Sequence, residues 1–193
     1  MSLPAPRLIA LDGVALTARA TTGDAGAFRE IYERHAPAVF RFLMNLLGDR
    51  GAADEATQET FVRAHGRLST VRETDKLLPW LFGIARNVCF ETRRAYAKTR
   101  KDLPVDELDD RVADAPNPEA LLLRREADEL LSRALQRIPE ERRAALLLQM
   151  DHGLPYAEIA TILEWSVAKV KIEIHRARLK LRAELSKYLG EQQ

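Results

Sequence analysis

The residues whose types and spacing point most directly to a chemistry lie between Leu154 and Leu181. If a helix begins after Ser166, at about 100° per residue its exposed face and flanks carry Ala168, Lys169, Lys171, Ile172, His175, Arg176, Arg178, Leu179 and Arg182. Lysine and arginine neutralise phosphates, and a helix fits the major groove of DNA. The pattern therefore predicts a surface for nucleic acid.

Two short helices would position this face. Pro155 suits a helix start, because its missing N–H is not needed there, and Ser166 can cap the second helix by accepting from orphan N–H groups. The apolar positions are Tyr156, Ile159, Ala160 and Leu163 in the first helix, and Val167, Val170, Ile174, Ala177 and Leu181 in the second. This arrangement predicts a helix-turn-helix. The alternative is an ordinary amphipathic helix pair whose cationic face is only solvated.

The composition favours an all-α protein with segregated charge. Of 193 residues, 46% are hydrophobic, 31% charged and 6% aromatic, which argues against a large sheet. The net charge is only +1, yet a basic run at residues 93–101 is followed by an acidic stretch that contains prolines, and the C-terminal helix is basic again. We therefore expect two small helical domains, residues 1–101 and 118–193, joined by an acidic linker over residues 102–117.

Several protein classes are excluded by what the sequence lacks. The single cysteine, Cys89, rules out a disulfide framework and is predicted to be a small buried apolar residue. The four histidines show no metal-ligand spacing, so neither a metal nor another cofactor is expected. Without a phosphate-binding glycine loop, or a nucleophile and base at motif spacing, the protein is not expected to be an enzyme. No segment approaches the about 20 apolar residues of a membrane span, so we expect a cytoplasmic protein without stable membrane insertion.

The N-terminal half predicts a bundle of amphipathic helices. A short helix over residues 14–20 precedes Asp24, a good N-cap for a helix that Pro37 ends or kinks, and a third helix follows. Residues 52–65 combine a broad polar face, which by itself indicates only solvation, with a narrow apolar stripe of Ala53, Ala56, Thr57, Thr60, Phe61 and Ala64. Residues 66–76 are polar and lack a period, which predicts a loop long enough to be functional.

A helix that starts at Pro79 combines cations, an amide and aromatic rings. Its polar side carries Arg86, Asn87, Phe90, Arg93 and Arg94. Arginines hold phosphates, an asparagine can bond a base edge, and a ring can stack on an exposed base. This side is therefore suited to a strand of nucleic acid. Trp80 is predicted to be a core residue, whereas core packing and base stacking both stay open for Phe90.

Four segments in order resemble the ECF group of bacterial RNA polymerase sigma factors over nearly the whole chain. They are ATQETFVRAH at residues 56–65, PWLFGIARN at residues 79–87, IPEERRAALLLQ from Ile138, and LPYAEIATIL through HRARLKLR. The resemblance implies two domains, σ2 and σ4, which give core RNA polymerase its promoter specificity. The σ2 domain would bind the β′ clamp helices and read and open the −10 element. The σ4 domain would read the −35 element and touch the β flap, and an anti-sigma factor is a further implied partner.

The resemblance also assigns roles to residues. The polymerase-binding helix would present Asp54, Glu55, Gln58, Glu59 and Phe61, which replaces the solvated-face interpretation. A loop that captures a flipped −10 base would hold Ser69, Thr70, Arg72 and Lys76, with Asn87 beside it, Arg86, Arg93 and Arg94 along the backbone, and Phe90 available for stacking. The −35 contacts would come from Ser166, Ala168, Lys169, Lys171, Ile172, His175 and Arg176.

The chain departs from the family pattern at a few positions. Ile172 and Glu173 stand where a small polar residue and an arginine are frequent. Ile172 can touch a thymine methyl group but cannot donate a hydrogen bond, and Glu173 is expected to order Lys169 at i,i+4 spacing. Glu164 stands where glycine is frequent, and Gly83 replaces a side chain that is often basic.

Two functions are alternatives to a sigma factor. They are a helix-turn-helix regulator that never engages polymerase and a sigma-like adaptor that binds another protein.

Overall fold

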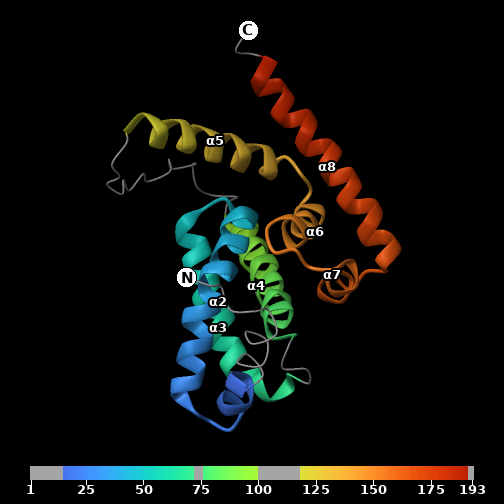
Figure 1. Ribbon diagram of the computed structural model, residues 1–193. Helices are drawn as coiled ribbons and strands as arrows, with labels where there is room; N and C mark the ends of the chain where they lie inside the picture. The colour runs from blue at the N-terminus through green and yellow to red at the C-terminus, as the bar shows by residue number, and fades with distance from the viewer. Residues whose placement is uncertain (1–14, 72–75, 100–117, 191–193) are drawn as a thin grey trace, which may run out of the picture.

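The computed structural model describes residues 15–71, 76–99 and 118–190, and every regular element in these ranges is a helix (Figure 1). The expected all-α fold is therefore confirmed. After a helical stretch at residues 15–21, the elements are α2 (Ala25–Leu47), α3 (Arg50–Arg67), the 3-10 turn η1 (Leu68–Thr70), α4 (Leu77–Thr99), α5 (Pro118–Gln136), α6 (Glu140–Met150), α7 (Tyr156–Leu163) and α8 (Val167–Gly190).

Helices α2, α3 and α4 pack against one another as the N-terminal bundle. Asp24 caps α2, as predicted, by accepting from the Ala27 N–H at 3.1 Å. Of the two effects predicted at Pro37, an end or a kink of the helix, the end is wrong, because α2 continues through Pro37. Proline removes one helical hydrogen bond, but the residues on either side, Ile31 and Phe42, are fully buried. Burial of two large apolar side chains stabilises the continuous helix by several kcal/mol, which offsets that loss.

Helices α7 and α8 form the helix-turn-helix predicted from the sequence, and α6 packs against both (Figure 1). Helix α5 packs against α8, α6 and α2. The Ser166 hydroxyl accepts from the Lys169 N–H at 3.2 Å, which is the predicted cap. Of the predicted apolar stripe of α8, the buried members are Val170, Ile174, Ala177 and Leu181. The first member, Val167, is 50% exposed, so its assignment to the stripe was wrong. It is the first residue of α8, and burial begins one turn later.

The turn between α7 and α8 contains a strained residue. Glu164 has φ 55° and ψ 39°, a left-handed conformation that a side chain with a Cβ adopts at a cost of about 1–2 kcal/mol. This explains why glycine would be favoured there. We expect Glu164→Gly to raise the free energy of unfolding by about 0.5–1 kcal/mol, after the greater freedom of glycine in the unfolded chain is subtracted. Urea denaturation measures the change, and Glu164→Ala, which keeps the Cβ, should show no gain.

Candidate polymerase and nucleic-acid interfaces

The outer face of α3 carries four of the residues assigned to polymerase binding. Asp54, Glu55, Gln58 and Glu59 are exposed, whereas the predicted apolar stripe on the other side of α3 is buried. The Glu59 carboxylate accepts from Arg63 Nε at 2.7 Å, and Arg63 Nη2 donates to Glu91 of α4 at 2.7 Å. This chain of ion pairs links α3 to α4 and fixes the side of the acidic face that adjoins α4.

Phe61 does not lie on that face. It is 3% exposed, and its ring meets the Tyr32 ring edge-on at a centroid distance of 4.8 Å. Its assignment as a polymerase contact was therefore wrong, because a side chain inside the bundle cannot touch a partner. The next residue, Val62, is 68% exposed and was missed. Sequence periodicity could have found it, since Val62 continues the Gln58 side of the helix.

The residues assigned to −10 DNA are divided among different environments. Asn87 and Arg94 are exposed on α4, Ser69 and Thr70 are exposed in η1, and Lys76 is exposed before α4. Arg72 lies outside the described residues. Of the residues assigned on α4, the structure therefore leaves Asn87 and Arg94 exposed, whereas Arg86 and Arg93 are engaged elsewhere.

Arg86 and Arg93 face the C-terminal half of the chain. The Arg86 side chain is 12% exposed, its guanidinium lies over the Phe90 ring at 4.8 Å, and Glu164 of the α7–α8 turn is 3.9 Å away. Arg93 donates to the Leu46 carbonyl at 3.0 Å, to Gln136 Oε1 at 3.2 Å and to Glu140 Oε2 at 3.3 Å. The bonds to Gln136 and Glu140 join the two halves, and with the bond to Leu46 they keep Arg93 from a DNA strand in this arrangement.

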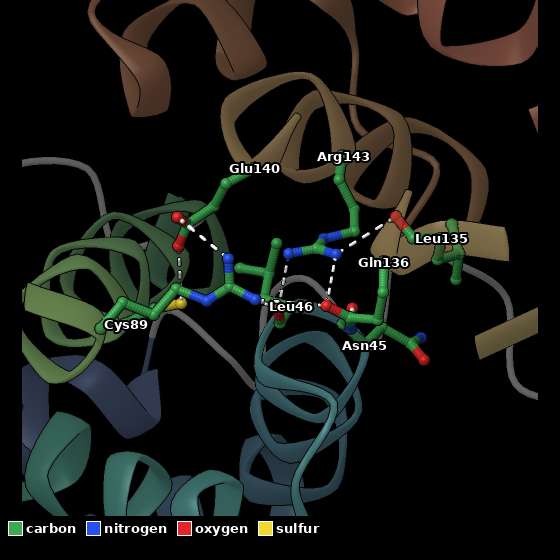
Figure 2. A network of polar contacts seen from close by, with 8 residues as sticks. Asn45, Leu46, Cys89, Leu135, Gln136, Glu140 and Arg143 are labelled. Atoms are coloured by element: carbon green, nitrogen blue, oxygen red, sulfur yellow. Dashed lines mark hydrogen bonds and ion pairs between the residues drawn. The ribbon is translucent and has the colours of Figure 1, made fainter. Parts of the chain in front are cut away.

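A buried polar network joins the two halves at the C-terminal end of α2 (Figure 2). Arg143 of α6 is 1% exposed and donates to the carbonyls of Leu46 at 2.8 Å and Leu135 at 3.1 Å, and to Gln136 Oε1 at 2.6 Å. Gln136 Nε2 in turn donates to the Asn45 carbonyl at 3.1 Å. The last carbonyls of a helix have no partner within it. The C-terminal half thus contributes to the cap of α2, and no pattern in the sequence indicates this role of Arg143.

Cys89 lies at the edge of the same network. Its buried Sγ donates to Glu140 Oε1 at 3.4 Å, as Figure 2 shows. Burial, with the neighbouring Glu140 carboxylate, raises the pKa of the thiol to about 12. A thiol with so high a pKa stays protonated and unreactive at neutral pH. The predicted role of Cys89 as a small buried residue is therefore confirmed.

His152 is a second point of contact between the halves. Its ring lies 4.4 Å from that of Phe82 and 6.1 Å from that of Phe42, centroid to centroid, and its Nε2 is buried. Burial lowers the pKa of His152 below its ordinary value; the Arg41 charge adds to this effect and the Asp151 carboxylate opposes it. The neutral imidazole is therefore the form that the folded chain favours.

The lowered pKa makes stability depend on pH. Between the folded-state pKa and the ordinary value of about 6.5, the unfolded chain binds more protons. The contribution of the neutral His152 to the free energy of unfolding is therefore fully present above about pH 6.5, and it decreases as the pH falls below that value. We expect the free energy of unfolding, from urea titrations at pH 7.5 and 5.5, to fall less in His152→Gln than in the parent. Burial also lowers the pKa of His35. The same titrations on His35→Gln therefore measure how much of the parent's loss comes from His35. Equal losses in parent and His152→Gln would contradict the expectation.

The residues assigned to the −35 element share one exposed surface, which we call the α8 face. It consists of Ser166, Ala168, Lys169, Lys171, Ile172, His175 and Arg176, all exposed, along the N-terminal half of α8. Lys169 Nζ lies over the Trp165 ring at 4.1 Å. The cations predicted from helical periodicity are therefore together, and Ile172 is exposed among them at 50%.

Glu173 is not placed as the sequence suggested. The carboxylate does not pair with Lys169; instead it accepts from Arg142 Nε of α6 and from Arg176 Nη1 at 2.8 Å. Arg142 lies in the segment that begins at Ile138, in which no DNA contact was predicted. Only the packing of α6 on α8 brings its guanidinium to the edge of the α8 face.

Neither a metal site nor a membrane segment is visible in the described ranges. Their His, Cys, Asp and Glu side chains form no group of three or more that could hold a metal ion. None of the helices in those ranges has the length and apolar character needed to cross a membrane.

Comparisons with known proteins identify the family. The chain matches Sigma-70 region 2 over residues 31–99 and Sigma-70 region 4 over residues 128–181. It is 32% identical to the ECF RNA polymerase sigma factor SigE of Mycolicibacterium smegmatis over 173 residues, covering 88% of this chain and 67% of SigE. It is 31% identical to SigM of Bacillus subtilis over 156 residues, covering 80% of this chain and 92% of SigM.

A solved structure of CnrH in complex with the cytosolic domain of CnrY has the same fold. The TM-score is 0.66 at 26% identity, with 91% of this chain and 97% of CnrH covered. The sequence matches and the shared fold agree with the exposed cationic α8 face and the acidic α3 face. The chain therefore belongs to the ECF group of RNA polymerase sigma factors, which bind core RNA polymerase and direct transcription initiation.

Proposed function

We propose that this sigma factor reads two promoter elements, each with one half of the chain. The observation that carries the proposal is the α8 face, where cations stand on the exposed side of a helix whose other side is packed into a helix-turn-helix unit. Such a helix can enter the major groove while its cations neutralise flanking phosphates. In this proposal, residues 118–193 read the −35 element and residues 102–117 are a linker.

Residues 1–101 would bind the polymerase and the −10 element. The exposed carboxylates and amide of α3 form the surface for the β′ clamp helices, together with Val62. Asn87 and Arg94 of α4, with Ser69, Thr70 and Lys76, receive the −10 strand after the duplex opens. Opening costs a few kcal/mol for each unstacked step, and a surface of cations and rings offsets that cost. Arg86 and Arg93 can join this surface only after the two halves separate.

The chain would act in the cytoplasm and carry out no chemistry itself, since the polymerase that it directs synthesises the RNA. A protein partner that holds the free chain, as an anti-sigma factor does, is part of the proposal. The similar chain CnrH was solved with the cytosolic domain of another protein, CnrY. That precedent supports a protein partner for this chain and leaves the partner's identity to experiment.

Run-off transcription of genomic fragments with core RNA polymerase, in the presence and absence of the chain, tests the proposal. We expect new discrete start sites that require the chain, and loss of these sites with Asn87→Ala or Lys171→Ala. Core polymerase alone is the control. If the chain bound duplex DNA, did not bind core polymerase and produced no new start sites, it would be a regulator instead, and the proposal would be wrong.

A further inference from the structure

Glu173 is an anionic residue on the helix proposed to enter DNA, yet it is not exposed to a ligand. Only 8% of the residue is accessible, and both carboxylate oxygens accept hydrogen bonds from arginines, Oε2 from Arg142 and Oε1 from Arg176. Burial by itself would raise the pKa of Glu173, but the hydrogen bonds and charges of Arg142 and Arg176 outweigh it and lower the pKa. The group is therefore an ionised carboxylate enclosed by two cations.

The two arginines reach it from different helices. Arg176 is one turn further along α8, whereas Arg142 lies in the first turn of α6. The Arg142 side chain remains 38% exposed and the Arg176 side chain 56%, so both guanidinium groups reach solvent beside the carboxylate. Each guanidinium has five N–H donors, and the pairing with Glu173 accounts for only one donor of each.

A groove of about 370 Å³ separates the N-terminal ends of α6 and α8 at this place. It is lined by Pro139, Glu140, Glu141, Arg142, Trp165, Lys169 and Glu173. Lys169 lies at the same edge of α8 as Glu173 and Arg176, because positions 169, 173 and 176 are spaced by four and three residues. Three cations, Lys169, Arg142 and Arg176, therefore lie around the enclosed Glu173 carboxylate, while Glu140 and Glu141 of α6 line the other side of the groove.

Two roles for Glu173 make opposite predictions. If the carboxylate merely stands near DNA, it repels phosphates and weakens binding. If it holds the two arginines in place, its charge is already offset, and the arginines gain a fixed orientation in which less side-chain entropy is lost on binding phosphate. The enclosure and the two hydrogen bonds favour the second role.

We propose that Glu173 is a positioning residue that orients Arg142 and Arg176 toward DNA phosphates, so that Arg142 of α6 belongs to the −35 interface. The inference rests on the proposed function, because it concerns the DNA surface of the same helix. Arg142 and Arg176 contact the backbone at one edge of the α8 face, and Glu173 itself touches no DNA. Phosphate contacts of this kind fix the register of a recognition helix on the duplex.

The test measures duplex DNA binding by the full chain over a range of salt concentrations. The probes are a 30-base-pair duplex taken from upstream of a start site mapped by run-off transcription and a random-sequence duplex of the same length. We expect Glu173→Gln and Arg142→Ala each to weaken binding of the promoter duplex about fivefold to tenfold. For Arg142→Ala, the slope of log K against log salt should become shallower by about one, the value for one lost phosphate contact. Because Glu173 acts through Arg142 in this proposal, the double variant should lose less binding free energy than the two single variants lose together.

Glu141→Gln is the matched control, because it removes the same charge as Glu173→Gln from the lining of the same groove, in the turn of α6 that carries Arg142. It should not weaken binding of the promoter duplex. Thermal unfolding by circular dichroism establishes that each variant is folded, and Arg142→Ala still tests the inference if Glu173→Gln does not fold. Tighter binding by Glu173→Gln, or unchanged affinity and slope in Arg142→Ala, would overturn the inference.

Lys171→Ala separates this inference from the proposed function. If Lys171→Ala weakens binding and flattens the slope while Arg142→Ala does not, the −35 assignment of α8 stands and the inference about Arg142 is wrong. If Lys171→Ala also has no effect, the α8 face is not the DNA surface, and the proposed −35 assignment falls together with the inference.

Discussion

Replacing Arg143 with alanine is expected to lower the free energy of unfolding by about 3 kcal/mol or more. The substitution removes three hydrogen bonds of a side chain that is 1% exposed, and it leaves the carbonyls of Leu46 and Leu135 buried without this donor. Each carbonyl keeps one other donor, Arg93 for Leu46 and the Ile138 N–H for Leu135, so the expected loss comes from three hydrogen bonds to a charged group, at about 1 kcal/mol or more each, and from the volume of the side chain. Urea denaturation at pH 7.5, followed by circular dichroism, measures the change.

Arg143→Lys is the control for this prediction. Burial and the nearby Arg93 charge lower the pKa of Arg143 to about 10. The charge of Arg143 is therefore itself destabilising, and its hydrogen bonds offset this effect. Lysine keeps the charge but lacks the planar fork that reaches two carbonyls at once. We expect it to recover less than half of the loss. An Arg143→Ala chain within about 0.5 kcal/mol of the parent, the usual range for surface substitutions, would show that the network contributes nothing to stability.

Replacing Gln136 with alanine is expected to raise the affinity of the free chain for a single-stranded −10 oligonucleotide. Gln136 bonds Asn45 and Arg93 across the contact between the halves, and Arg143 within the C-terminal half. A net loss of about 1 kcal/mol at this contact releases Arg93 more often. Because the apparent dissociation constant scales inversely with the competent fraction of the chain, the affinity rises by up to about fivefold.

Fluorescence anisotropy with an oligonucleotide that copies the strand opened at a mapped start site measures the effect. Gln149→Ala is the matched control, since Gln149 bonds Arg178 within the C-terminal half. It should leave the affinity unchanged. Weaker binding by Gln136→Ala would mean that the contact between the halves supports DNA binding instead of competing with it.

The sequence by itself determined the local features of this protein. Helical periodicity depends only on neighbours three and four positions apart, so it correctly predicted the buried stripe of α3, the stripe of α8 apart from Val167, and the exposed cations of the α8 face. Caps are equally local, which is why Asp24 and Ser166 were found. The order of the four segments predicted the family.

Only the tertiary structure decided which charged residues form contacts inside the folded chain. Arg143 is buried because it donates to a carbonyl 97 residues earlier in the chain, and no local pattern distinguishes it from its neighbour Arg142. Glu173 pairs with Arg142, 31 residues away, instead of with Lys169 in the next turn. Pro37 stays helical because packing on both sides outweighs a lost hydrogen bond. These outcomes depend on which backbone and side-chain groups distant segments bring together, and that is set by the packing of the helices.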